Sequence, residues 1–170
     1  CIRDRIEGLE FEDDNLSPEI ALNYYINDDT SVYVAYKKAF KSGGIDHSAL
    51  PTASINPLSP TFAGFDALIY DSEEADGFEI GLKSNLLNNS MRLNATYYKY
   101  EYTDLQVQFF DAAIIQFSTF NAGAVETEGF EADVLWNTDI EGLTLRGQFA
   151  WTDATNTGDF ITPGGENLKG

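Results

Sequence analysis

The sequence predicts an all-β fold, an antiparallel up-and-down meander of about six strands. Two observations lead to this prediction. Apolar and polar residues alternate with a period of two in six segments of the 170-residue chain, a period typical of strands with one apolar and one polar face. Short polar turns alternate with longer connections between these segments, as expected when consecutive strands pair antiparallel.

The first two predicted strands illustrate the alternation. In the first, Ile20 and Leu22 share one face, opposite Glu19 and Asn23. The second strand is apolar on both sides, so the sequence does not decide which of its faces is the apolar one. The six predicted strands are residues 18–27, 31–40, 77–87, 91–108, 120–137 and 143–154.

The later strands alternate more clearly. Phe78 and Ile80 in the third strand alternate with Glu79 and Lys83. The fifth strand is the clearest, and the apolar members of the last four strands lie opposite a more polar set. The apolar set includes Phe78, Ile80, Leu93, Tyr97, Phe130, Val134, Trp136, Phe149 and Trp151, and the opposite set includes Glu79, Lys83, Arg92, Glu131, Asp133 and Arg146.

The connections differ in length in a regular way. Residues 27–30, 88–90 and 139–142 are short turns rich in Asn, Asp, Ser and Gly, which favour turn geometry. Residues 41–75 and 111–119 form longer connections. The short turns should therefore lie at one end of the sheet and the long loops at the other, as in outer-membrane barrels. A long structureless loop counts against a compact soluble domain.

These features predict a sector of a large transmembrane β-barrel. Charged side chains fall on the less apolar face, where they avoid the cost of facing lipid. Trp136 lies beside a short turn and Trp151 near a long loop, so each indole is expected near one membrane interface. Six strands are too few to close, because the smallest membrane barrels use eight and open edges are not tolerated in hydrocarbon.

Composition excludes several functions. A formal net charge of −18 disfavours binding to nucleic acid. Cys1 is the only cysteine, so the chain has no internal disulfide or cysteine-based metal site. Cys1 could be the lipidated start of a lipoprotein, although truncation explains it equally well. No apolar run is long enough for a transmembrane helix, and no signal peptide is present.

Candidate ligand-binding residues are few. Tyr98, Tyr100 and Tyr102 share one strand face and could stack against cargo, although a structural aromatic ladder is the favoured interpretation. His47, the only histidine, lies in the long loop and could contact a ligand; a hydrolytic triad lacks its sequence context. No catalytic residue, cofactor or metal ligand is predicted.

Two acidic groups are candidate sites. Glu126, Glu128, Glu131 and Asp133 could suggest paired catalytic carboxylates. On a regular strand the first two lie on the face opposite the last two, unless Gly129 marks a bulge, and acids that line a lumen are the favoured interpretation. The acids at residues 71–76 could bind calcium, but they lack the spacing of a calcium loop and are better explained as a solvated surface.

Four stretches, in the same order, resemble TonB-dependent receptors of the outer membrane. The resemblance covers roughly residues 17–154, and each stretch by itself is a weak signal. The stretches are residues 31–44 (SVYVAYKKAFKSGG), 77–84 (GFEIGLKS), 97–107 (ending in YTDLQV) and 121–131 (NAGAVETEGFE).

The resemblance implies the later part of a 22-stranded barrel domain, without the N-terminal plug domain or the segment that contacts TonB. It also implies a receptor, not an enzyme, in the outer membrane of a Gram-negative bacterium. Its partners would be TonB, outer-membrane lipid and a scarce nutrient, most commonly an iron–siderophore complex. A passive porin-type channel and a soluble all-β binding module are the alternatives.

Overall fold

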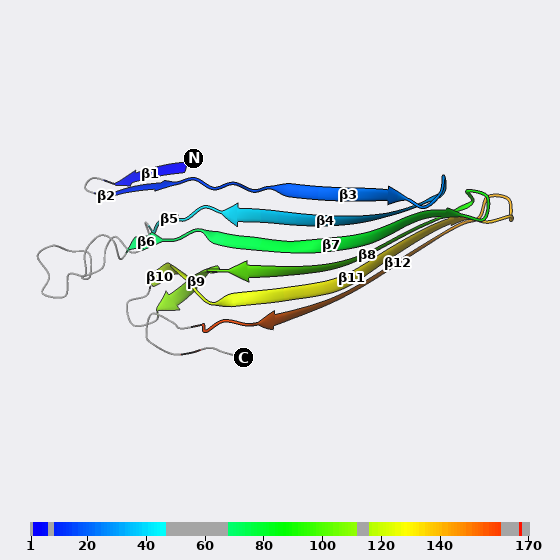
Figure 1. Ribbon diagram of the computed structural model, residues 1–170. Coiled ribbons are helices and arrows are strands. Elements are labelled where there is room, and N and C mark those ends of the chain that lie inside the picture. Colours follow the sequence, from blue (N-terminus) through cyan, green and yellow to red (C-terminus); the bar gives the residue numbers. More distant parts are fainter. Residues whose placement is uncertain (1, 7–8, 47–67, 112–115, 161–166, 168–170) are drawn as a thin grey trace, which may run out of the picture.

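A six-stranded antiparallel meander forms the main body of the protein (Figure 1). The computed structural model describes residues 2–6, 9–46, 68–111, 116–160 and 167. Each strand pairs with its neighbours in sequence order, which confirms the predicted fold class. The strands are β3 (Glu19–Tyr25), β4 (Thr30–Lys41), β7 (Glu73–Leu86), β8 (Met91–Thr103), β11 (Ala124–Asn137) and β12 (Thr144–Asn156).

Three smaller hairpins lie beyond one end of this sheet (Figure 1). Two of them extend the register of the large strands without a slip, since Lys41 faces Glu73 and, three residues further out, Gly44 faces Tyr70. The hairpins are β1 (Ile2–Ile6) with β2 (Leu9–Asp13), β5 (Gly44–Ile45) with β6 (Ile69–Tyr70), and β9 (Gln106–Asp111) with β10 (Gln116–Asn121).

The predicted strand 91–108 is wrong in one respect, because it is two strands, β8 and β9. Asp104 adopts a left-handed φ of 53° and interrupts the extended backbone. The partner segment is interrupted at the same level, where Gly123 has a φ of 56°. The predicted connections 41–75 and 111–119 are likewise too long, because β5, β6, the start of β7 and most of β10 fall within them.

The short turns lie together at one end of the sheet and the longer connections at the other (Figure 1). Local backbone geometry explains the turns. Leu87, Asn88 and Asn89 have φ values of 53°, 52° and 68°, and Gly142 has a φ of 78°. The Asn27 side chain accepts a 2.9 Å hydrogen bond from the Asp29 backbone N–H. The structure therefore has the end-to-end asymmetry that the sequence predicted.

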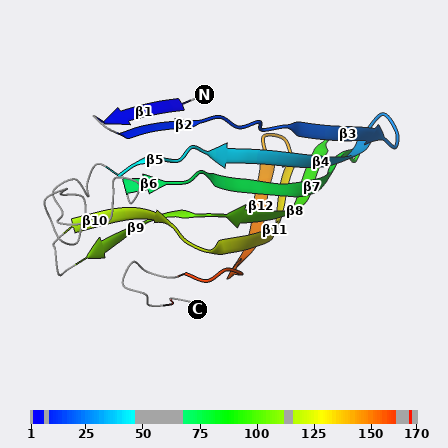
Figure 2. The ribbon, with the colours of Figure 1, turned by 60° about the vertical axis from the view of Figure 1, so that its left-hand side comes forward.

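Register assigns every large strand one apolar and one polar face. Leu22, Val34, Ile80, Tyr97, Phe130 and Trp151 form one row across all six strands. The next row, on the opposite face, contains Asn23, Tyr33, Gly81, Thr96, Glu131 and Ala150. The charged residues predicted for the less apolar face all lie on this polar face. The second predicted strand, now β4, turns Val34 to the apolar face. Figure 2 shows that the sheet is twisted.

Tyrosines on the polar face cover glycines on neighbouring strands. Tyr33 lies directly opposite Gly81, and a Cβ added at Gly81 would overlap the Tyr33 ring. Tyr100 covers Gly77 and Tyr98 covers Gly129 in the same way. Each glycine thus provides the space in which a cross-strand aromatic ring lies flat on the sheet. Register is continuous through Gly129, so this residue marks an aromatic contact and no bulge.

We predict that Gly81→Ala destabilises the complete protein in lipid vesicles by about 1–3 kcal/mol, because the new methyl group overpacks against Tyr33. Gly147→Ala is the matched control, since among the described residues its added Cβ would meet a single side-chain atom, Val134 Cγ1, at 3.2 Å. Urea unfolding measured by tryptophan fluorescence would compare the two variants. Equal stabilities would contradict this account of the tyrosine–glycine pairs.

Candidate functional site

The apolar face forms a belt of exposed large side chains on five of the six strands, and the apolar residues of β8 between them are half-buried. The exposed fractions of these side chains range from 38% at Phe130 to 69% at Tyr24. A contiguous apolar surface of this extent is rare on proteins in water and marks a membrane or a protein interface. The belt comprises Ile20, Leu22, Tyr24, Val34, Tyr36, Phe78, Ile80, Phe130, Leu145, Phe149 and Trp151.

Charged residues bound the belt on the side of the longer connections. Tyr36 Oη donates a 3.3 Å hydrogen bond to Asp76, and Tyr97 Oη donates a 2.8 Å bond to Glu128. Lys99 Nζ, next on this face, lies 2.8 Å from Glu126 Oε1. Aromatic rings with polar tips are favoured where hydrocarbon meets water. This edge therefore has the composition of a membrane interface.

The placement of Glu126 and Glu128 corrects the sequence interpretation. The favoured interpretation of the sequence places both with Glu131 and Asp133 on a lumen face, which requires a bulge at Gly129. Because β11 is regular, Glu126 and Glu128 lie on the apolar face beyond the belt, while the other two lie on the polar face. The four carboxylates do not form one cluster.

Trp136 and Trp151 lie at opposite ends of the belt. Trp136 pairs with Leu145 beside the short turn, and Trp151 lies two residues before Asp153, at the charged edge. This is the arrangement that interfacial indoles would have.

The polar face carries a network of hydrogen bonds. Glu79 accepts a 2.6 Å bond from Tyr100 Oη and a 2.9 Å bond from Lys37 Nζ. Lys37 therefore compensates the charge of Glu79, and the two partners leave this carboxylate little capacity for a ligand. The Tyr33 and Thr96 hydroxyls are 3.1 Å apart, and Lys83 Nζ lies 5.4 Å from the centre of the Tyr33 ring.

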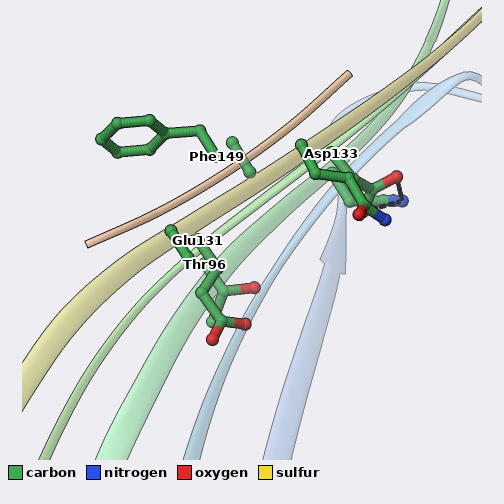
Figure 3. Close-up of a pocket in the computed structure, with 8 residues that line it drawn as sticks. Thr96, Glu131, Asp133 and Phe149 are labelled. Carbon is green, nitrogen blue, oxygen red and sulfur yellow. Dashed lines mark hydrogen bonds between the residues drawn. The ribbon is translucent and has the colours of Figure 1, made fainter. Parts of the chain in front are cut away.

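The two faces are visible around β11 and β12 in Figure 3. Thr96, Glu131 and Asp133 project on one side of the ribbon, and the Phe149 ring projects on the other. Asn94 Nδ2 on β8 donates to both carboxylate oxygens of Asp133 on β11, each at 3.1 Å. Polar partners thus meet on one side and apolar surface remains open on the other.

An open hollow of about 470 Å³ on the polar face brings together the three tyrosines that the sequence suggested. The Tyr98 and Tyr100 rings lie 6.2 Å apart at 41°. The hollow is lined by Tyr33, Glu79, Thr96, Tyr98, Tyr100, Tyr102, Thr127 and Glu131. His47, the fourth candidate, lies outside the described residues.

Structural roles separate these tyrosines. Tyr98 and Tyr100 each cover a glycine and donate or share a hydrogen bond, with Thr152 at 2.8 Å and Glu79 at 2.6 Å respectively. Tyr102 faces Ala75 and Val125, and its hydroxyl makes no hydrogen bond to the residues that the structure describes. Tyr102 is therefore the member of the row with an uncommitted phenol.

Acidic residues do not assemble a metal site in the described part of the chain. Glu74 Oε2 lies 2.8 Å from Lys38 Nζ, and Glu73 accepts a 2.9 Å bond from the Gln106 backbone N–H. These partners occupy two of the acids considered as calcium ligands. No helix within the described ranges is long and apolar enough to cross a membrane.

Some partners were missed from the sequence because they depend on register. The ion pair of Lys37 with Glu79 joins β4 to β7 diagonally. Gln106 and Asn121 lie in two of the four matched stretches, and their side chains bond to backbone groups of a third segment. The Lys37–Glu79 pair could have been predicted from one feature of the sequence, namely opposite charges on the same face of adjacent predicted strands.

A family model described as "TonB dependent receptor-like, beta-barrel" matches residues 4–170. The chain belongs to the TonB-dependent receptor family. Proteins of this family are transport receptors in the outer membrane of Gram-negative bacteria. The family assignment confirms the resemblance seen in the four sequence stretches. No curated protein matches the chain.

Solved receptor structures share the fold at low sequence identity. The siderophore receptor PirA from Pseudomonas aeruginosa is 19% identical, with a TM-score of 0.59 over 84% of this chain and 26% of PirA. The ferric yersiniabactin uptake receptor FyuA from Yersinia pestis is 20% identical, with a TM-score of 0.60 over 88% of this chain and 20% of FyuA. The chain thus spans about a quarter or less of these receptors.

A third structure is the Pseudomonas aeruginosa ferripyoverdine receptor bound to ferripyoverdine. It is 15% identical to this chain, with a TM-score of 0.58 over 94% of this chain and 19% of the receptor. These likenesses support the fold of the six-stranded sheet as a sector of a large barrel.

The two faces predict opposite responses to one substitution at adjacent positions of β12. Phe149→Arg places a charge on the belt and should destabilise the complete receptor in vesicles by about 2–4 kcal/mol near the bilayer midplane. Gln148→Arg, on the polar face, should change stability by less than about 1 kcal/mol. Denaturant titration of both variants provides the measurement. A larger loss for Gln148→Arg would reverse the assignment of the faces.

Proposed function

We propose that this chain forms part of the wall of a receptor that imports an iron–siderophore complex across the outer membrane, with energy supplied through TonB. The observation that carries the proposal is the separation of an exposed apolar belt from a hydrogen-bonded polar face on one continuous sheet. Such a sheet fits between lipid and an aqueous lumen. Family membership supplies the transport role.

The cargo class rests on the neighbours. PirA is described as a siderophore receptor and FyuA as a ferric yersiniabactin uptake receptor. The polar face of this chain supports a similar use, because its hollow presents aromatic rings that can stack on an organic ligand and the Tyr102 phenol, which can hydrogen-bond to it. TonB and the siderophore are thus the proposed partners, and outer-membrane lipid surrounds the belt.

The two alternatives from the sequence are less well supported. A passive porin-type channel would share the two faces of the sheet, but family membership argues against it. A soluble binding module would need to bury the apolar face, and eleven large side chains of the belt are at least 38% exposed.

Transport of radiolabelled iron tests the proposal. Cells that lack the gene for the complete receptor, and cells that lack TonB, would be supplied with iron as a hydroxamate, a catecholate or a carboxylate siderophore. Uptake of one class should be lost in both strains, and supplying the complete receptor should restore it in the receptor-deficient cells but not in cells that lack TonB. Unchanged uptake of all three classes would overturn the siderophore proposal, and uptake lost only in the receptor strain would point to a passive channel.

Tyr102 is the proposed cargo contact on the polar face. Tyr102→Ala should weaken binding of the imported siderophore about two- to tenfold, because an aromatic contact contributes about 0.5–1.5 kcal/mol. Tyr98→Ala is the matched variant, and it should lower the stability of the receptor because the ring over Gly129 is lost. Intrinsic fluorescence titration and urea unfolding separate the two effects. Unchanged affinity in Tyr102→Ala would exclude this contact.

A further inference from the structure

Two side-chain amides connect the outer hairpins. Gln106 of β9 and Asn121 of β10 face each other across one hairpin. Gln106 Nε2 lies 2.8 Å from the Ser42 carbonyl oxygen, 3.0 Å from that of Asp71 and 3.3 Å from that of Lys41. The three carbonyls flank the base of the β5–β6 hairpin, since Lys41 ends β4, Ser42 precedes β5 and Asp71 follows β6. We refer to Gln106 and Asn121 together as the outer clasp.

Asn121 completes this connection. Its Nδ2 donates to the Asp71 carbonyl oxygen at 2.9 Å, and its Oδ1 accepts from the Asp71 backbone N–H at 2.7 Å. Both members of the outer clasp therefore bond to Asp71, which lies between β6 and β7. A neutral amide suits this role because it offers both donors and an acceptor to backbone groups.

A bend in the backbone brings the outer clasp to its partners. Asp104 and Gly123 lie at the same level of the β8–β11 hairpin, and both have a left-handed φ. Asn121 Nδ2 donates a 2.7 Å bond to the Asp104 carbonyl oxygen, so the clasp also bonds to the strained residue. A side chain at Gly123 would meet the Phe160 ring, which leaves glycine as the residue that fits both the conformation and the space.

Within the described residues, no β-ladder joins the β5–β6 hairpin to the β9–β10 hairpin. Pairing of β7 with β8 ends at Glu74 and Thr103, so the two hairpins leave the membrane wall as separate arms. Figures 1 and 2 show β6 and β10 side by side beyond that point. Side-chain contacts must therefore set how these arms lie relative to each other.

Three buried apolar residues lie in or next to the strands of the two hairpins. Ile45, Leu68 and Ala122 are only 4%, 2% and 3% exposed, while the wall strands leave their apolar side chains open. The Thr119 backbone N–H donates a 2.7 Å bond to Asp46, which is 7% exposed. Burial and hydrogen bonding thus coincide at one site outside the belt.

We propose that Gln106 and Asn121 are positioning residues that hold the β5–β6 and β9–β10 hairpins in one relative arrangement, and so shape the outer surface that cargo meets. The second part rests on the proposed function. The first part concerns the fold alone and holds for any cargo.

The test uses the complete receptor in lipid vesicles, with spin labels at Tyr70→Cys on β6 and Ser118→Cys on β10. Double electron–electron resonance measures the distance distribution between the labels. The near-isosteric variants Gln106→Glu and Asn121→Asp replace an amide donor by an acceptor and should broaden the distribution, most strongly when combined. Gln108→Glu on β9 is the matched control and should leave it narrow, because Gln108 makes no side-chain hydrogen bond to the described residues.

A distance distribution that stays narrow in the folded double variant would overturn the proposal that Gln106 and Asn121 position the two hairpins. If the double variant does not insert, the two single variants decide the question by the same criterion. Uptake kinetics with the three radiolabelled siderophores test the second part, and we expect a several-fold rise in KM at an unchanged maximal rate per folded receptor. An unchanged KM beside a broadened distribution would overturn the cargo part alone. Absence of uptake by the unsubstituted receptor would refute the proposed function and leave the distance result standing.

Discussion

Backbone hydrogen bonding in hydrocarbon is the constraint on which the structure depends. An unpaired N–H or C=O costs several kcal/mol in lipid, so strands can cross only as part of a closed sheet. Neighbouring strands of the six-stranded sheet pair through ladders that run without a slip or a bulge. Because register is unbroken, each position keeps its face from the first row to the last. The apolar belt, the polar face and the charged edge all follow from that continuity.

The same continuity explains the pairing of tyrosines with glycines. A large ring on the polar face needs a neighbour without a side chain, and Gly77, Gly81 and Gly129 stand directly opposite such rings. The rings cover backbone that glycine would expose, and their hydroxyls reach polar partners further across the sheet. Tyr33, Tyr98 and Tyr100 therefore have structural roles. Tyr102 differs from them, because among the described residues it neither covers a glycine nor makes a side-chain hydrogen bond.

Beyond the belt, the hairpins depend less on continuous backbone pairing than the six-stranded sheet does. Water can satisfy backbone groups there, so the ladders are free to bend and separate. Asp104 and Gly123 bend one hairpin, and Gln106 and Asn121 tie it to the next through backbone carbonyls. The wall is therefore fixed by main-chain pairing, and the outer arms by a few side chains.

Period-two alternation was sufficient to predict the fold, the faces of Phe78, Ile80, Glu79 and Glu131, and the placement of turns and long connections. The alternation of apolar and polar residues did not predict where the backbone departs from a regular strand. The left-handed Asp104 divided a predicted strand, since aspartate is compatible with both conformations. For Glu126 and Glu128 the sequence left the face open between a regular strand and a bulge at Gly129, and the favoured lumen-lining interpretation is wrong because the strand is regular. The Lys37–Glu79 pair and the outer clasp depend on register between distant segments, which no local pattern contains.

The central claim is that one face of this sheet meets lipid and the other meets water. Spin labels placed singly at residues 130–134 of β11, in the complete receptor in vesicles, test it most directly. Collision rates with oxygen should be high at Phe130, Ala132 and Val134, and rates with a water-soluble nickel complex should be high at Glu131 and Asp133. Rates that show no alternation, or the opposite alternation, would contradict the account.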